Sequence, residues 1–425
     1  MNLEFLDVVL FSIYFLLLFL SIFWLLVLFT KEEQKGKEGK EKENPGTPFF
    51  SAIVPAYNEE NSIELALQSL VGLEYPSEKM EIIVVNDGST DRTPEIIKQF
   101  VHKHPSHKII LLNQKNQGKA AAMNHGLRYA QGELFACLDA DSAVSSNALQ
   151  AMLPLFEDDG NVAAVCPLIK VKRPQKVLEK VQWYEYIINM FHRFLNAKLD
   201  CLHVTPGPFS IYRTQIIRNI GGFDEHTITE DLEIAVRLQK HHYQILHTFD
   251  AVVETVAPAT WKALFRQRVR WYKGATDNTI QYKELLFNRK YGDFGVLRMP
   301  TVILSGILAI VLAGTLLYEL GRAAMEKLAY YYSINFDFLT LLRNFSPEIN
   351  ILTWPFAKLF IALTLAGISF FIMIYSHRII KERITNHGRT FFSLVSYLLI
   401  YGFFLTAVWL YIGFMYVSGR KNFWA

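Results

Sequence analysis

The chain carries long apolar stretches near its two ends and a mixed region between them. Four stretches are apolar over about 17 to 27 residues with almost no charge, the length at which a helix crosses the hydrocarbon core of a bilayer. They are Val8 to Phe29, Met299 to Tyr318, Leu359 to Tyr375 and Phe391 to Val417. A signal peptide is the alternative for the first, but Met1 to Asp7 contain no Lys or Arg. The pattern predicts a multi-pass integral membrane protein.

Basic residues beside these stretches predict its orientation. The segments KEEQKGKEGKEKE (31–43) and SHRIIKERITNHGRT (376–390) are rich in Lys and Arg, and short basic loops stay in the cytoplasm. Residues 30–298 should then be cytoplasmic, at the plasma membrane, with the amino terminus outside. The predicted regions are a membrane anchor (1–29), a charged linker (30–48), a catalytic domain (49–258), an interfacial helix region (259–298) and a carboxyl-terminal membrane region (299–425).

From residue 49 onward, short runs rich in β-branched residues alternate with amphipathic segments. FFSAIVPAY, EIIVVND, KIILLN and LFACLDAD predict strands, and NSIELALQSLVGL, TPEIIKQFVHKH and KAAAMNHGLRYAQ predict helices. This alternation implies an α/β fold with a doubly wound, mostly parallel sheet. Ligands bind such sheets at the carboxyl ends of the strands, where Tyr57, Glu59, Asp87, Asp139 and Asp141 lie.

Asp139 and Asp141 form a D-x-D motif at the end of the fourth predicted strand. On an extended strand both side chains project from the same side, and their mutual repulsion favours a cation beside them. Carboxylate oxygens suit Mg²⁺ or Mn²⁺, whose remaining ligands would be water and a diphosphate. Ser89 and Thr90, by contrast, fit ordinary turn and cap roles.

A second acidic cluster lies in HTITEDLEIAVRLQK. The spacing of Thr227 and Glu230 resembles a capping box, which places Asp231 in the first turn of a helix. Two roles are open for Asp231. It could stabilise the helix dipole, or it could act as a general base, which requires burial or a neighbouring acid to raise its pKa.

The stretch TWKALFRQRVRWYKGATD (260–277) concentrates cations and tryptophans. It could be a helix on anionic lipid, a nucleic-acid patch, or part of a site for a phosphorylated sugar donor. The net charge of +3 gives nucleic-acid binding no support. The three cysteines match no zinc pattern, and the absence of a Walker A motif and a G-x-S-x-G elbow from the sequence argues against ATPases and hydrolases.

Seven motifs stand in one order along the chain: SAIVPAYNEEN, VVNDGSTD, NQGKAAAMN, LDAD, GPFSIYR, GGFDEHTITED and PATWKALFRQRVRWYKG. Together they resemble the membrane-embedded, processive family 2 glycosyltransferases, such as poly-N-acetylglucosamine, chitin-oligosaccharide and hyaluronan synthases. The resemblance implies a GT-A fold and a metal-dependent, inverting transfer of a sugar, N-acetylglucosamine, from a UDP-sugar to a growing polysaccharide, coupled to export. A non-processive glycolipid synthase and an inactive nucleotide-sugar sensor or export scaffold are the alternatives.

The same resemblance implies residue roles. Asp231 matches the catalytic base, and Asp141 with Asp139 matches the metal ligands. Donor binding falls to Pro55, Ala56, Tyr57, Glu59, Asp87, Lys119, Asp139 and Arg270, with Asn86 as the alternative to Asp87 at the nucleobase. Acceptor binding falls to Gly207, Pro208, Phe209, Ser210, Glu230, Gln267, Arg268 and Trp271.

On a helix, Gln267, Arg270 and Trp271 would share one face, so that Arg270 meets the donor diphosphate and Trp271 meets a sugar ring. Lys262, Arg266 and Lys273 are expected to reach lipid headgroups. The expected partners are a UDP-sugar donor, Mg²⁺ or Mn²⁺, a growing glycan or lipid acceptor and membrane lipid, but not nucleic acid. Because four spans are few for a polymer channel, a second copy of the chain or an export partner is also expected.

Overall fold

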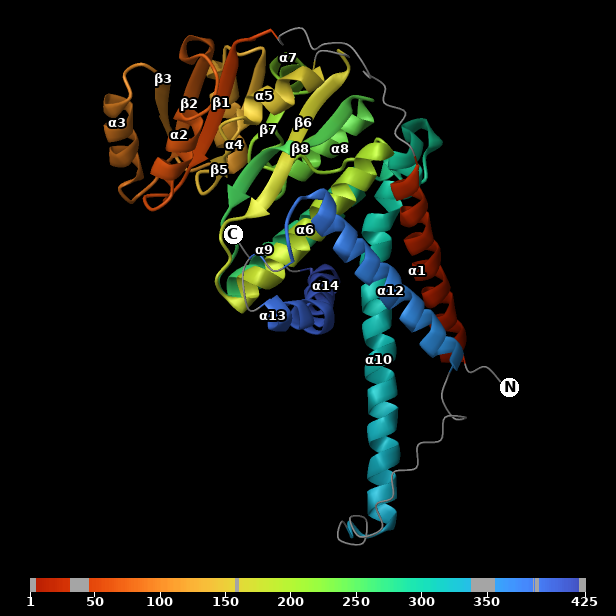
Figure 1. The fold of residues 1–425 in the computed structure, drawn as a ribbon. Coiled ribbons are helices and arrows are strands. Elements are labelled where there is room, and N and C mark those ends of the chain that lie inside the picture. Colours follow the sequence, from red (N-terminus) through yellow and green to blue (C-terminus); the bar gives the residue numbers. More distant parts are fainter. Residues whose placement is uncertain are drawn as a thin grey trace. The chain divides into compact units, whose positions relative to one another are not determined.

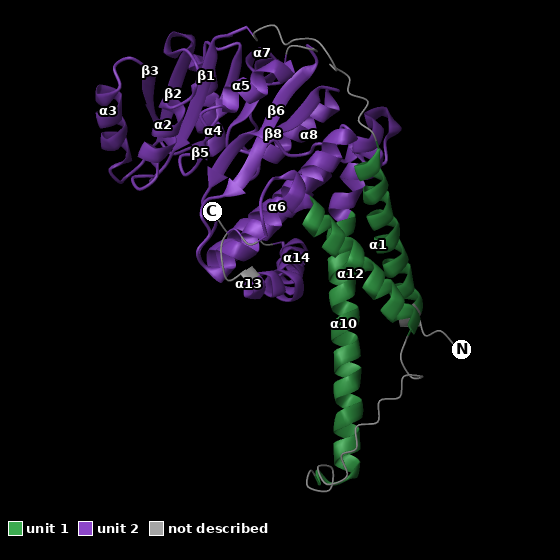
Figure 2. Cartoon of the chain, viewed as in Figure 1, with its two compact units in different colours: residues 1–30, 304–375 green, residues 31–303, 376–425 purple. Residues whose placement is uncertain are grey.

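The computed structural model describes residues 5–30, 46–156, 160–337, 356–384, 386 and 390–419. Most of the predicted charged linker, residues 31–45, therefore lies outside the described residues. The chain divides into two compact units (Figure 2): residues 1–30 with 304–375, and residues 31–303 with 376–425. The last membrane-type segment thus belongs to the same unit as the central α/β region.

An eight-stranded mixed sheet forms the centre of the larger unit (Figure 1). Its order is β3-β2-β1-β4-β7-β6-β8-β5. The strands are β1 (Phe50–Ala56), β2 (Met80–Asp87), β3 (Lys108–Gln114), β4 (Leu134–Cys137), β5 (Ala143–Val144), β6 (Val162–Val171), β7 (Ser210–Arg213) and β8 (Gln244–Thr255). The first four are parallel, β7 is antiparallel to both β4 and β6, and β8 is parallel to β6. The predicted α/β fold is confirmed, with antiparallel pairing confined to β7 and β5.

Both faces of the sheet are buried, and successive residues of a strand point to opposite faces. Along β1, Ala52 and Val54 join one apolar cluster, whereas Ile53 joins the other. Helix α2 packs on the first face through Leu67, and α4 packs on the second through Met123. This double coverage explains why the strand sequences are almost continuously apolar.

The helices of this unit connect the strands or flank the sheet. They are α2 (Ile63–Val71), α3 (Thr93–Lys103), α4 (Lys119–Tyr129), α5 (Ala148–Met152), α6 (Val177–Lys198), α7 (Thr214–Asn219), α8 (Glu230–Lys240) and α9 (Trp261–Gln281), followed near the carboxyl terminus by α13 (Thr390–Ser396) and α14 (Gly402–Ser418). Short 3-10 turns η1 (Ser77–Lys79), η2 (Leu153–Phe156), η3 (Lys283–Leu285) and η4 (Arg289–Tyr291) and π-helical segments η5 (Phe294–Arg298) and η7 (Tyr397–Tyr401) complete it.

Among the described residues, four helices are long and apolar enough to span a membrane: Val8–Phe29, Phe294–Ser333, Phe356–Ile379 and Phe391–Ser418. The smaller unit holds α1 (Phe5–Phe29), most of α10 (Met299–Ser333) and α12 (Phe356–Ile379). Within it, the rings of Phe29 and Phe371 have centroids 6.5 Å apart.

Helix α10 continues past Tyr318, where the apolar stretch ends. Arg322 pairs with Glu319 at 2.9 Å and lies 3.6 Å from Glu326, and such pairs three or four residues apart support a polar helix. The helix therefore includes part of the 321–356 region, to which no role was assigned from the sequence, while residues 338–355 lie outside the described part of the chain.

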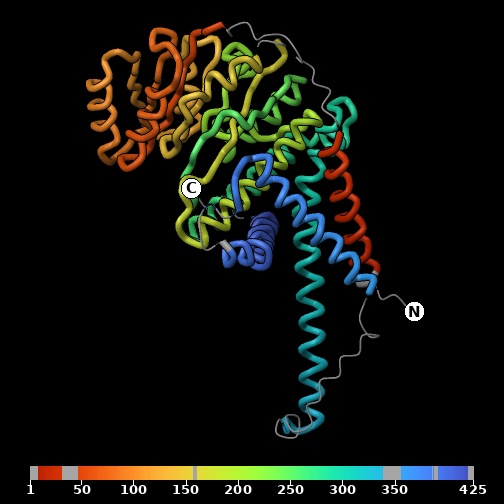
Figure 3. The backbone as a smooth tube through the Cα atoms, viewed as in Figure 1, coloured from red at the N-terminus to blue at the C-terminus, as the bar shows by residue number. Residues whose placement is uncertain are grey.

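Helices α9 and α14 lie side by side within the larger unit (Figure 3). Aromatic rings line the contact: Tyr272 lies 5.0 Å from Trp409, and Phe265 lies 5.4 Å from Tyr411. Farther along, Tyr416 donates a hydrogen bond to Asp277 at 2.5 Å. Lys273 pairs with Asp277 at 2.6 Å and lies over the Tyr416 ring, so this lysine, expected to reach lipid headgroups, is instead held inside the contact.

Candidate active site

The loops that follow β1 and β2 are joined by hydrogen bonds. The Asn58 carboxamide oxygen accepts from the Thr90 backbone N–H at 2.8 Å, and the Ser89 hydroxyl accepts from the Asn58 N–H at 3.0 Å. Asn58 has a φ of 56°, a left-handed conformation that asparagine tolerates better than most residues. Tyr57, which precedes Asn58 at the end of β1, is 46% exposed.

Asp87 is buried at the end of β2 and holds the segment in front of α4. Its carboxylate accepts from the backbone N–H groups of Gln117 and Gly118, both at 2.9 Å, and from Gln114 Nε2 at 2.8 Å. Asn86 is likewise engaged, because its amide donates to Asn113 at 2.9 Å. Asp87 therefore positions the start of α4, and its contact with a nucleobase stays a prediction.

The first residue of α4, Lys119, joins three parts of the site. Its ammonium lies 2.6 Å from Asp139 Oδ1 and 2.8 Å from Glu230 Oε1. Burial opposes the charge of Lys119, but Asp139, Glu230 and Asp231 together raise its pKa well above the usual range. Gly207 allows this approach, since a Cβ there would lie 2.8 Å from the ammonium and 3.1 Å from Asp139 Oδ2.

Asp139 and Asp141 lie in a turn and not on an extended strand. Strand β4 ends at Cys137, and the Ser142 N–H donates to the Asp139 carbonyl at 3.0 Å. The strand-alternation argument for the D-x-D motif is therefore wrong, because pairing with β1 and β7 stops at Cys137. The two side chains are nevertheless neighbours: burial, and then the charge of Asp139, raises the pKa of Asp141.

Glu59 adds a third carboxylate to this edge of the sheet. Burial raises its pKa, the Ser62 hydroxyl lowers it, and the charges of Asp141 and Asp139 raise it further. Neighbouring carboxylates repel one another unless a proton or a cation compensates them. Lys119 pairs with Asp139, whereas the pKa values of Glu59 and Asp141 are raised by burial and by the neighbouring carboxylates.

Asp231 lies in the first turn of α8 beside the Lys119 cluster. Burial and the charge of Glu230 raise the pKa of Asp231 to about 6, against the opposing influence of Lys119 and Arg270. Thr205 fixes this turn, since its backbone N–H and hydroxyl donate to the Asp231 carbonyl at 3.0 and 2.9 Å. The structure thus gives Asp231 the burial and the neighbouring acid that a base at a helix amino terminus requires.

Glu230 differs from Asp231 in that its pKa is lowered. Burial acts to raise the pKa of Glu230, but Lys119 and Arg270 outweigh burial and lower it. The predicted capping box is wrong: α8 begins at Glu230 with Thr229 at its N-cap, and Thr227 accepts from the Thr229 N–H at 3.3 Å. Glu230 is thus the first helical residue and not the third, and its carboxylate pairs with Lys119.

Helix α9 brings the QRVRW motif to this cluster. Arg270 is exposed, and its charge acts on both Glu230 and Asp231. Gly274 permits close packing, since a Cβ there would overlap the Thr229 side chain. Asn278 also donates to the Thr229 hydroxyl at 3.1 Å. The helix is thereby fixed against the residue that precedes Glu230 and Asp231.

The structure does not bring every predicted residue to the site. Arg268 is fully buried and pairs with Glu185 of α6, because its position on α9 points away from Arg270. Phe209 and Ser210 are also buried, and the Ser210 hydroxyl donates to the Pro206 carbonyl at 2.6 Å. Pro55 and Ala56 are buried strand residues of β1. These five residues are buried, whereas Pro208, Gln267 and Trp271 are partly exposed.

Tyr186 is a site residue that the sequence motifs did not reveal. It lies on α6, and its ring centroid is 6.5 Å from that of Trp271. Burial raises the pKa of Tyr186 to about 12, and the charges of Arg268, Glu185 and Asp141 also act on it. The available signal was Gln182 and Glu185 within an otherwise apolar helical stretch, which indicates buried polar partners.

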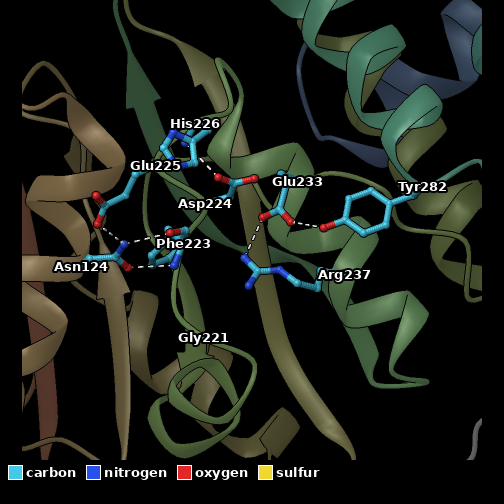
Figure 4. Close-up of a pocket in the computed structure, with 9 residues that line it drawn as sticks. All are labelled: Asn124, Gly221, Phe223, Asp224, Glu225, His226, Glu233, Arg237 and Tyr282. Carbon is cyan, nitrogen blue, oxygen red and sulfur yellow. Dashed lines mark hydrogen bonds and ion pairs between the residues drawn. The ribbon is translucent and has the colours of Figure 1, made fainter.

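A hollow of about 390 Å³ is lined in part by Asn124 of α4 and by Glu233 and Arg237 of α8 (Figure 4). Its polar side chains pair with one another: Asn124 donates to Glu225 at 2.8 Å, and Glu233 accepts from Arg237 at 2.7 Å and from Tyr282. The lining includes Gly221, Phe223, Asp224 and His226 but none of the predicted site residues. The lining of this hollow contains no member of the cluster formed by Lys119, Asp139, Glu230 and Asp231.

The chain is similar to known proteins. Residues 51–221 match the family described as Glycosyl transferase family 2. The poly-beta-1,6-N-acetyl-D-glucosamine synthase of Staphylococcus epidermidis is 30% identical over 282 residues, which cover 63% of this chain and 67% of that protein. The synthase of the same name from Staphylococcus aureus strain MSSA476 is 30% identical, covering 67% of this chain and 68% of that protein.

A solved structure shares the fold. The mannosyltransferase PcManGT from Pyrobaculum calidifontis, in complex with GDP-Man and Mn²⁺, is 19% identical with a TM-score of 0.60, covering 96% of this chain and 99% of that one. With the mixed sheet and the acidic site at its edge, these likenesses support a GT-A type fold and glycosyl transfer. This chain belongs to glycosyltransferase family 2.

Proposed function

We propose that this chain is a membrane-embedded, processive, inverting transferase that adds N-acetylglucosamine from UDP-N-acetylglucosamine to a growing polysaccharide. The convergence of Lys119, Asp139, Glu230 and Asp231 beside Arg270 carries the proposal. The named activity of the Staphylococcus relatives supports the choice of sugar and polymer. The four candidate spans and the basic segments beside them support a site on the cytoplasmic side of the plasma membrane.

The chemistry requires one base and several charge-stabilising groups. Asp231 accepts the proton of the acceptor hydroxyl as its oxygen attacks the anomeric carbon of the donor from the face opposite the diphosphate. The bond from that carbon to the diphosphate oxygen breaks, and UDP leaves with the electron pair. Lys119 and Arg270 stabilise the negative charge that develops on the diphosphate. A pKa of about 6 leaves Asp231 mostly ionised, and thus able to accept a proton, at neutral pH.

A divalent cation fits this donor side. Within the described ranges no three His, Cys, Asp or Glu side chains are arranged to hold a metal by themselves. Asp139 and Asp141 would share the ion with the diphosphate and water, and Glu59 is a further carboxylate on which their charges act. When bound, the ion supplies positive charge to the leaving diphosphate. Both Mg²⁺ and Mn²⁺ suit such oxygen ligands.

The test is a donor and product assay with the full chain in lipid nanodiscs. UDP-N-acetylglucosamine, UDP-glucose and GDP-mannose are compared with Mg²⁺, Mn²⁺ or EDTA, and released nucleotide and product length are measured. We expect release only from UDP-N-acetylglucosamine, a ladder of chain lengths and loss of activity with EDTA. One sugar on a lipid would instead identify a glycolipid synthase, and exclusive use of GDP-mannose would overturn the assignment of the donor.

A further inference from the structure

Arg268, the second residue of the QRVRW motif, forms a buried ion pair. Arg268 has 0% exposure on α9, and its Nε donates to Glu185 Oε1 on α6 at 3.0 Å while Nη2 donates to Glu185 Oε2. The same Nε lies 3.2 Å from the hydroxyl of Tyr401 in η7. Three segments that are far apart in the sequence therefore meet at one guanidinium group.

The other side of this guanidinium faces Trp271. The Arg268 Cζ atom lies 4.1 Å from the centroid of the Trp271 ring, within the range of a cation–π contact. Gln267 accepts a hydrogen bond from Arg268 Nη1. Arg268 thus contacts two residues that were predicted to bind the acceptor, without being exposed itself.

The chemistry of the contact requires arginine. A guanidinium can hold a carboxylate with two hydrogen bonds and still present its flat face to an aromatic ring, whereas an ammonium cannot do both. Burial opposes the charge of Arg268, but Glu185 outweighs burial and raises its pKa. The side chain therefore stays charged in the interior and fixed in direction.

We propose that Arg268 is a positioning residue that sets the orientation of Trp271 and links it, through Glu185 and Tyr401, to α6 and to the last membrane-type segment. The proposal rests on the proposed function, in which Trp271 is the platform for an acceptor sugar ring. The hydrogen bond from Tyr416 of α14 to Asp277 of α9 belongs to the contact between these helices but does not involve Trp271. It provides a matched control.

The kinetic test uses full-length variants in nanodiscs with an N-acetylglucosamine pentasaccharide as the acceptor probe. Losing the stacked guanidinium in Arg268→Lys should raise the acceptor KM by about 3- to 30-fold, with the donor KM and acceptor-independent UDP release unchanged. Tyr401→Phe should raise the acceptor KM about 2- to 10-fold. Tyr416→Phe, which removes the hydroxyl that donates to Asp277, should leave the acceptor KM unchanged. Equal effects of the two tyrosine variants would overturn the proposal.

A double-mutant comparison separates positioning from general support. In the Trp271→Ala background, Arg268→Lys should change the acceptor KM no further, because the residue through which it acts is gone. An undiminished effect in that background would mean that Arg268 serves the fold and not the platform. Gel filtration and thermal unfolding of each variant identify any that fail to fold.

A spectroscopic readout tests the orientation without any activity. Tryptophan is replaced by 5-fluorotryptophan, and the ¹⁹F signal of Trp271 is assigned by its absence from Trp271→Phe. Arg268→Lys and Tyr401→Phe should shift or broaden the Trp271 signal and leave the signals of the other tryptophans unchanged. Tyr416→Phe should leave the Trp271 signal unchanged. An unchanged Trp271 signal would refute positioning by Arg268. If the wild type makes no polymer but these shifts occur, the proposed function fails and the positioning stands.

Discussion

The loops after β1 and β2 are joined by hydrogen bonds between residues 31 and 32 positions apart, whereas α9 is fixed by partners 49, 83 and 133 positions away. In the first region, the proposed donor side, short polar side chains close turns by hydrogen bonds. In the second region, the proposed acceptor side, a buried ion pair, a glycine contact and aromatic rings join separate segments. Local turn chemistry tolerates change better than close packing between distant segments, which is why substitutions in the two regions should differ in cost.

Asp231 lies where the two regions meet, so its loss should have the largest effect. Asp231→Asn keeps the shape of the side chain but removes the base, and transfer should fall by about 10²- to 10⁴-fold. Donor binding, measured by calorimetry with UDP, should persist because Lys119 and Asp139 are unchanged. Loss of UDP binding in this variant would make Asp231 a donor ligand.

Gly274→Ala should be the most damaging of the small substitutions on the acceptor side. The added Cβ would overlap Thr229 and push α9 from the turn that holds Glu230 and Asp231. Overpacking of this kind costs about 1–3 kcal/mol of stability. Thermal unfolding and UDP release measure the effect, and Gly402→Ala, where the added Cβ meets no atom within 4 Å, is the matched control. Equal behaviour of both variants would contradict the close-packing argument.

The pH dependence should report Asp231. Because its pKa in the folded protein is about 6, transfer should fall about tenfold for each pH unit below that value as the base becomes protonated. Asp231 binds its proton more tightly in the folded than in the unfolded protein, so its contribution to stability should fall as pH rises from about 4 to about 6. Unfolding of Asp231→Asn across that window should lack this component. A flat activity profile between pH 5 and 7 would contradict the assignment.

On the donor side, Asn58→Gly should have the smallest effect. Glycine keeps the positive φ but removes the carboxamide that accepts from Thr90, at a cost of about 1 kcal/mol. The expected result is a small rise in donor KM with kcat unchanged, measured by UDP release. A loss as large as that of Gly274→Ala would remove the distinction between the two regions.

The sequence predicted the first four strands of the sheet, for a physical reason. Apolar runs and turn residues fix strands and loops locally, so the position of Glu59 after β1 followed from alternation, whereas the roles of Lys119 and Asp231 were implied by motif order and stay predictions. It failed where a local pattern was extended too far, as with Asp139 and Asp141, which were placed on a strand that ends at Cys137.

The acceptor side could not be predicted in the same way. Helical spacing shows that Arg268 and Arg270 point in different directions, but it does not show that Glu185 and Tyr401 meet the first of them. Those contacts depend on how α6, α9 and η7 pack, which no local pattern encodes. A buried charge on a helix indicates that a partner exists but does not identify it.

One ammonium group serves two carboxylates, because Lys119 lies 2.6 Å from Asp139 and 2.8 Å from Glu230. Its charge also acts on Asp231, the proposed base. A diphosphate drawn to this ammonium would therefore change the electrostatic surroundings of the base. Donor binding and the basicity of Asp231 are thus expected to be coupled through a single side chain.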